Sequence, residues 1–135
     1  RPMMLVPEGW SKPYGDTIGI AWNHATETAR VVAMGMPIIA KAKKVVVIAV
    51  DGWVHAGPDT VALQKYLEGH GIETELRTGA SGGNPGDRAL EVAASADVDL
   101  MIKGAYTQSR LTQMIFGGAT RAILDRAQIP VVFAN

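Results

Sequence analysis

The sequence contains no cysteine, which excludes disulfide bonds, thiolate metal ligands and thiol catalysis. It carries no net charge, because 13 Lys and Arg residues balance 13 Asp and Glu residues, so it lacks the basic footprint that nucleic-acid binding usually needs. Long apolar runs are also missing, since the longest, residues 45–50, is far shorter than the roughly 20 residues that span a bilayer. We therefore expect a soluble, cytoplasmic protein that binds neither nucleic acid nor membrane.

Sequence patterns that carry catalysis are missing as well. There is no Gly-x-Ser-x-Gly nucleophile elbow, and no set of Ser, His and acid has a distinctive spacing. His24, His55 and His70 are far apart in the chain, and none has a histidine partner at a spacing that would put both on one helix face. We expect no catalytic residues, no metal site and at most a weak ATPase activity.

What the sequence does contain is the pattern of one α/β domain. Its 135 residues, 47% of them hydrophobic, suffice for a single core. Apolar segments alternate with helical patterns, which is typical of a parallel sheet. The expected strands are residues 17–22, 45–50, 72–77, 98–102 and 129–134, and the expected helices are residues 25–40, 59–69, 85–96 and 119–127. Pro37 should kink the first helix or end it early.

The first residues fall outside this scheme. Residues 1–6 read as a further strand, and the turn-rich residues 7–16 read as a linker. The pattern echoes the end of the chain, where Pro130 also precedes an apolar run. We therefore divide the chain into residues 1–15, a remnant of a preceding similar domain or a dimerisation arm, and residues 16–135, the domain proper.

The segment from Gly104 to Thr120 joins an apolar strand to a helix and is built to hold an anion. Its glycines allow a sharp turn and a close approach to a ligand, and the free backbone N–H groups at the start of the helix can receive phosphate oxygens. Groups suited to a phosphate chain are the hydroxyls of Ser109 and Thr120, the guanidinium groups of Arg110 and Arg121, and the glycines Gly104, Gly117 and Gly118. The alternative is a tight turn with solvated arginines.

Residues at the carboxyl ends of neighbouring strands should converge on the same place. Asn23 could hydrogen-bond a ribose or base, or it could cap the first helix. Val50 could form an apolar wall against a base or simply belong to the core. Lys103 could neutralise phosphate or lie along the sheet edge. Asp51 and Asp99 could coordinate Mg²⁺ carried by a nucleotide, although Asp99 also fits as the start of a strand.

The chain resembles the universal stress protein family over nearly its whole length. Gly104 and Gly117 occupy the first and third glycine positions of the motif Gly-x2-Gly-x9-Gly-Ser/Thr, and residues 109–111, 116–121 and 129–132 are also similar to that family. The resemblance implies an open, doubly wound five-stranded parallel sheet of order 3-2-1-4-5, of the adenine nucleotide alpha hydrolase-like type. It also implies that an N-terminal edge strand runs antiparallel to the last strand.

The resemblance further implies a site for ATP, ADP or AMP, with Mg²⁺ carried by the nucleotide. Residues facing the adenosine would be Ala21, Asn23 and Val50, with Lys103 and Gly104 at the edge of the fourth strand and Gly117, Gly118 and Ala119 at the phosphates. Three positions depart from the binding pattern. Thr107 replaces the second glycine, Asn23 replaces an acidic residue, and Gly118 replaces the Ser or Thr, whose hydroxyl Thr120 could supply instead. Weak nucleotide binding is the expectation.

The leading hypothesis is a stress-response regulatory domain that binds an adenine nucleotide weakly. The alternatives are a dimerisation or interaction module of the same family that binds no nucleotide, and a nucleotide-dependent transferase or hydrolase of the wider α/β group. Family members pair their final strands edge to edge, within a tandem chain or across a homodimer, which covers exposed backbone groups. Residues 2–6 should therefore pair with residues 130–134.

Overall fold

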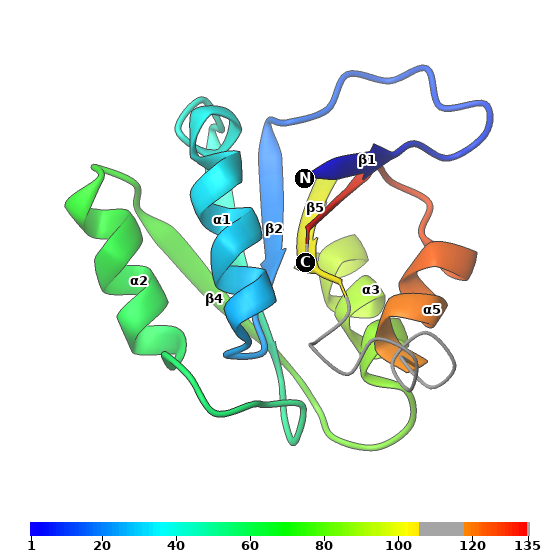
Figure 1. The fold of residues 1–135 in the computed structure, drawn as a ribbon. Coiled ribbons are helices and arrows are strands. Elements are labelled where there is room, and N and C mark those ends of the chain that lie inside the picture. The colour runs from blue at the N-terminus through cyan, green and yellow to red at the C-terminus, as the bar shows by residue number, and fades with distance from the viewer. Residues whose placement is uncertain (106–117, 135) are drawn as a thin grey trace.

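The computed structural model describes residues 1–105 and 118–134. A six-stranded sheet lies between two layers of helices (Figure 1). Its strands are β1 (Met3–Leu5), β2 (Thr17–Ala21), β3 (Lys44–Val50), β4 (Thr74–Gly79), β5 (Leu100–Gly104) and β6 (Val131–Ala134), and its helices are α1 (Thr26–Ile39), α2 (Thr60–Gly69), α3 (Pro85–Ser95) and α5 (Gly118–Arg126). Over the described ranges, no helix is both long and apolar enough to cross a bilayer.

The strand order confirms the predicted topology. Across the sheet the order is β1-β6-β5-β2-β3-β4, and the five strands from β2 onward are parallel, which corresponds to the order 3-2-1-4-5 when they are counted by themselves. The predicted pairing of the two chain ends is also confirmed, within one chain. Met3 lies opposite Phe133 and Leu5 opposite Val131 in an antiparallel pair, so both ends of the chain meet at this side of the sheet (Figure 1).

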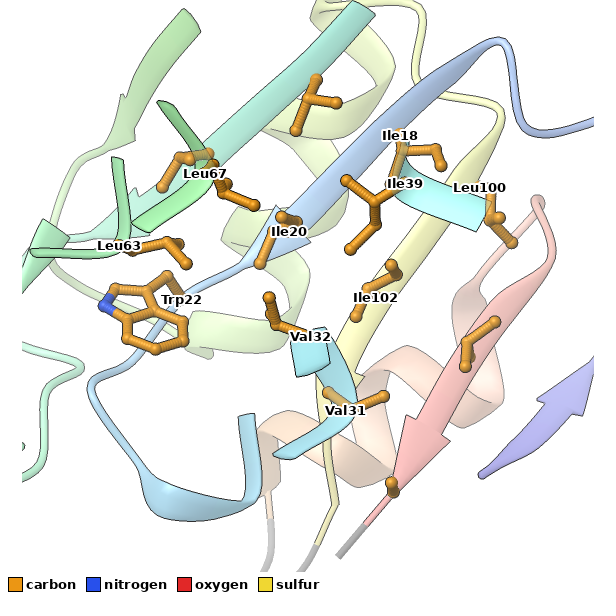
Figure 2. Close-up of a cluster of buried hydrophobic side chains, with 14 residues drawn as sticks. Ile18, Ile20, Trp22, Val31, Val32, Ile39, Leu63, Leu67, Leu100 and Ile102 are labelled. Atoms are coloured by element: carbon orange, nitrogen blue, oxygen red, sulfur yellow. The ribbon is translucent and has the colours of Figure 1, made fainter. Parts of the chain in front are cut away.

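Two apolar clusters hold the layers together, one on each face of the sheet. Figure 2 shows the first cluster, in which Ile18, Ile20 and Ile102 of the sheet pack under α1 and α2. The second cluster packs α3 and α5 against the other face and includes Met101 and Ile123. Each fully buried side chain of this size stabilises the fold by about 1.5–3 kcal/mol relative to exposure.

Helix α1 does not end early at Pro37, as the sequence suggested it could. It continues through Pro37 to Ile39, and the Ala40 N–H still donates to the Met36 carbonyl at 2.8 Å. Proline removes one helix hydrogen bond, and its ring crowds the carbonyl of the residue four positions earlier. Pro37 lies on the exposed face of the last turn, and the helix ends at Ile39, so little of the helix follows this disturbance.

Candidate functional site

The candidate site lies where the strand order reverses. The chain leaves β2 toward β3 on one side and leaves β5 toward β6 on the other, so the carboxyl ends of β2 and β5 are neighbours at the switch point of the sheet. Ligands of open α/β sheets bind at this kind of place. The residues that end β2 and β5 and those that begin α5 therefore define the site.

Lys103 is the most unusual residue at this edge, because its ammonium is buried. The side chain follows Met101 on the same face of β5, under α5, and the residue is only 3% exposed. Its Nζ donates to the Gly104 carbonyl at 2.6 Å and to the Thr120 hydroxyl at 2.9 Å, and it lies 5.4 Å from the centre of the Trp53 ring. Burial lowers the pKa of Lys103 to about 8.

Gly104 has a structural reason to be glycine. A Cβ atom at this position would overlap the Thr28 backbone nitrogen and would lie 2.6 Å from the Thr28 Oγ1 and 2.8 Å from the Glu27 carbonyl carbon. Real Cβ atoms essentially never come this close to other heavy atoms, and the first turn of α1 therefore requires glycine at the end of β5. Packing against α1 accounts for the first glycine of the motif without a ligand.

Asn23 holds the turn between β2 and α1. Its Oδ1 accepts from the Ala25 N–H at 3.2 Å and from the Thr28 hydroxyl at 2.8 Å, and the residue is buried. The N-cap position itself belongs to Ala25, whose side chain makes no capping bond. Asn23 therefore acts as an Asx-type turn residue next to the cap, and the oxygen that we proposed for ribose binding is already engaged.

Ala21 and Val50 do not face open space in this structure. They are 0% and 4% exposed and belong to the apolar cluster between the sheet and the helices α3 and α5. Trp53 is partly buried and packs on the same cluster. Val50 therefore belongs to the core of this structure, and its contact with a base stays a prediction.

Asp51 and Asp99 lie at opposite ends of the sheet and do not form one cation site, and Asp99 precedes β5, as the alternative interpretation expected. Asp51 directly follows the carboxyl end of β3, whereas Asp99 precedes the amino end of β5, and these two strands are parallel to β2 between them. The Asp99 carboxylate accepts from the Gly15 N–H at 2.7 Å and from the Thr17 N–H at 3.2 Å. Among residues 1–105 and 118–134 no group of three or more His, Asp or Glu side chains is arranged to hold a metal ion.

The N-terminus of α5 completes the site. The described part of this helix runs from Gly118, with Gly118 exposed, Ala119 half-buried and Thr120 buried against Lys103. Asn84, the N-cap of α3, donates from its Nδ2 to the Gly118 carbonyl at 3.1 Å. The first turns of α3 and α5 therefore lie side by side.

Four predicted site residues lie outside the described residues: Thr107, Ser109, Arg110 and Gly117. Sequence reasoning missed two residues of the site, Trp53 and Asn84. The Asx-Pro pair at Asn84 is a recognisable helix start and could have indicated the cap. Nothing in the sequence pattern placed Trp53 over the buried lysine, because that contact depends on how the loop after β3 folds.

The fold and this edge define an open α/β domain with an electropositive helix start at its switch point. Comparison with known sequences matches residues 41–135 to the Universal stress protein family, and the chain belongs to that family. No curated protein sequence matches the chain.

Solved structures with the same fold are also universal stress proteins. One from Archaeoglobus fulgidus DSM 4304 has a TM-score of 0.77 at 16% identity and covers 99% of this chain, which spans only 49% of that protein. A universal stress protein in complex with cAMP has a TM-score of 0.67 at 16% identity, covering 89% of this chain and 97% of its own. The universal stress protein from Archaeoglobus fulgidus in complex with dAMP has a TM-score of 0.61 at 16% identity, covering 90% and 98%.

Proposed function

We propose that this chain is a cytoplasmic regulatory domain of the universal stress type that binds an adenine nucleotide weakly at the edge formed by β2, β5 and the start of α5. The proposal rests on one observation at the switch point of the sheet. The buried ammonium of Lys103 donates to the hydroxyl of Thr120, near the start of α5. The ammonium and the helix start both attract phosphate oxygens. Relatives of the same fold that were solved with cAMP and dAMP support an adenine nucleotide as the ligand.

Three features support weak rather than tight binding. Asn23 offers an amide in place of a carboxylate, and its oxygen is engaged with Ala25 and Thr28. Gly118 offers a backbone N–H but no hydroxyl. Ala21 and Val50 are buried in the core, so a base that contacts them must first displace the groups that cover them. That displacement reduces the net affinity.

Calorimetric titration with ATP, ADP and AMP, each with and without Mg²⁺, tests the proposal. We expect measurable binding with a Kd in the millimolar to high micromolar range, about 4–6 kcal/mol of binding free energy. Denaturing the purified protein and analysing the released small molecules tests whether nucleotide is carried through purification. Undetectable binding at several millimolar nucleotide would refute nucleotide binding.

The residue at position 107 gives a sharper test of the same proposal. If the Thr107 side chain crowds the ribose or phosphates, Thr107→Gly should raise the affinity for the nucleotide by about tenfold, or about 1.4 kcal/mol. The matched control is Thr74→Gly on β4, at the opposite end of the sheet from the site, which should leave the affinity unchanged. Equal affinities for Thr107→Gly and the unaltered protein would remove crowding as the cause of weak binding.

A second candidate function is an interaction module of the same family that binds no nucleotide. Exposed apolar side chains on β1 and on the residue after it favour this candidate. Met3 is 61% exposed, Leu5 40% and Val6 50%. The occupant would be a second copy of this chain, whose edge strand would pair with the outer edge of β1. Sedimentation of the protein and of Met3→Asp separates the two: a dimer that the substitution abolishes supports the module, and a monomer at all concentrations removes it.

A further inference from the structure

Strand β4 is the edge of the sheet on the side opposite β1 (Figure 1). Its register with β3 runs without a bulge from Thr74 to Gly79, and among residues 1–105 and 118–134 no strand pairs with its other side. Alternate residues of an edge strand direct their N–H and C=O groups outward, where another strand can bind them. Proline, bulges and very short strands usually protect such an edge, and β4 has none of these features. It can therefore accept a further strand.

The side chains of β4 are arranged symmetrically about Leu76. A threonine stands two residues away on either side, and Glu75 and Arg77 flank Leu76 with opposite charges. When two such strands lie antiparallel with Leu76 opposite Leu76, Glu75 of each lies opposite Arg77 of the other, and Thr74 lies opposite Thr78. Opposite residues of an antiparallel pair have Cβ atoms about 4.5–5.5 Å apart, and opposite charges there are stabilising. The strand is thus complementary to a second copy of itself.

The charged side chains of β4 can reach a second copy without losing their present partners. The side chains of Arg77 and Glu75 are 40% and 37% exposed and form an ion pair within the strand, and Glu75 also pairs with Lys44 of β3 at 2.7 Å. The bond between Arg77 and Glu75 uses Nε, and a guanidinium has further N–H groups in a fixed fork. Those groups can bind the carboxylate of a second chain. Charges of one sign along β4 would repel a copy, whereas this pattern attracts one.

Two exposed apolar side chains accompany this edge. Leu76 is 45% exposed and shares a face of the sheet with Thr74, whose hydroxyl accepts from Gln64 of α2 at 2.9 Å. Helix α2 therefore lies on the Leu76 side. Val61, one turn before Gln64 on the same face of α2, is 55% exposed. Because α2 runs back against the strand direction, Val61 is displaced from Gln64 in the direction in which Leu76 follows Thr74. A chain that pairs with β4 would cover apolar surface as well as the edge.

We propose that two copies of this chain pair through β4, antiparallel and centred on Leu76, so that their sheets become one continuous sheet. The charge pattern selects a second copy over an unrelated strand. The dimer is distinct from pairing at β1, because β1 and β4 are opposite edges of the sheet. It also does not depend on nucleotide binding. The interface is small, so we expect a reversible dimer with a Kd on the order of 100 µM.

Charge reversal tests the proposed register. Glu75→Arg and Arg77→Glu each place like charges opposite each other at two positions of the dimer, so each variant alone should associate at least about tenfold more weakly than the unaltered protein. In an equimolar mixture of the two variants, every opposite pair again joins unlike charges. The mixture should therefore dimerise at least as tightly as the unaltered protein. Sedimentation at low salt, from about 10 µM to about 1 mM protein, measures the three dissociation constants.

The matched control is Arg30→Glu. It makes the same change of charge on the exposed face of α1, which packs over β5 and β6 away from β4, and it should dimerise as the unaltered protein does. Far-ultraviolet circular dichroism verifies the fold of each variant. Unweakened association of either single variant, or a mixture no more dimeric than its components, would overturn the proposal. A dimer that Met3→Asp abolishes and both reversals leave intact belongs to β1 and would overturn it as well.

Amide hydrogen exchange of the unaltered protein provides a second arm that needs no variant. At a Kd near 100 µM, about 15% of the chains are dimeric at 10 µM and about 80% at 1 mM, so the outward N–H groups of β4 should exchange about fourfold more slowly at the higher concentration. The N–H groups of β1 serve as the internal reference and should keep their rates. Unchanged exchange along β4 over this range would contradict the pairing.

Discussion

Replacing Lys103 with methionine should change the stability of the fold in a pH-dependent way. A fall of the pKa from 10.5 to about 8 means that the buried ammonium lowers the free energy of unfolding by about 3 kcal/mol at pH 7, since each pKa unit corresponds to about 1.4 kcal/mol. The loss is recovered as the pH rises from about 8 to about 10.5, because the folded protein has then released the proton while the unfolded chain still binds it.

Methionine removes the charge and keeps most of the aliphatic volume, but it also removes a donor. The Gly104 carbonyl and the Thr120 hydroxyl lose their hydrogen bonds to Nζ, which costs about 1–2 kcal/mol in total. We therefore expect Lys103→Met to be more stable than the unaltered protein by about 1–2 kcal/mol at pH 7 and less stable by a similar amount near pH 10.5. The change of sign is the diagnostic result.

Urea unfolding followed by far-ultraviolet circular dichroism, with linear extrapolation at both pH values, measures these differences. Alkali affects the stability of both proteins in other ways as well, so only the difference between the two proteins is informative at each pH. Lys43→Met is the control, and its stability difference should stay near zero because its side chain is exposed. A difference for Lys103→Met that is the same at pH 7 and pH 10.5 would refute the reasoning.

Three further predictions concern residues with structural roles at the two edges of the sheet, and urea unfolding checks each. Gly104→Ala should destabilise the fold by more than about 2 kcal/mol, because the new methyl group would overlap the backbone of α1 at Thr28; a loss below about 0.5 kcal/mol would show that α1 can move away. Asp99→Ala should cost about 1–3 kcal/mol, because the N–H groups of Gly15 and Thr17 lose the carboxylate to which they donate; Asp51 is exposed, so Asp51→Ala should cost little, and equal effects would contradict the assignment. Asn23→Ala should cost about 1–3 kcal/mol because the hydroxyl and N–H that it accepts from are buried beside it, and an unchanged midpoint would count against that role.

The order of the helices and strands could be predicted from the sequence, because it depends on the periodicity of apolar residues and on glycine and proline residues at the ends of the elements. Buried parallel strands appear as short continuous apolar runs, and Asp59 and Asn84 mark helix starts. That residues 1–6 form a strand could also be predicted, since this segment, like the end of the chain, places proline before an apolar run. These signals are local and need no knowledge of tertiary contacts. The pairing of β1 with β6 is not local, and its prediction came from the resemblance to the family.

The chemistry of the site could be predicted only in part, because it depends on which face a side chain takes and on how loops fold. Lys103 shares a face with Met101 in a strand that is buried on both sides, and this alternation alone could have predicted a buried ammonium. The position of Trp53 follows from a turn in which its N–H donates to the Val50 carbonyl and Gly52 has a φ of +80°. Such a turn has no periodic pattern of apolar residues in the sequence.

The glycine motif identifies the family more securely than it identifies a ligand. Gly104 is fixed by the first turn of α1, so a relative that had lost nucleotide binding would still need glycine there to keep its fold. The start of α5 is constrained as well, because Gly86 of α3 leaves no room for a Cβ atom beside the Ala119 carbonyl. Retained glycines therefore report packing, and the ligand must be inferred from groups that packing does not require. Lys103 is such a group, since an apolar side chain would fill the same place in the core at less electrostatic cost.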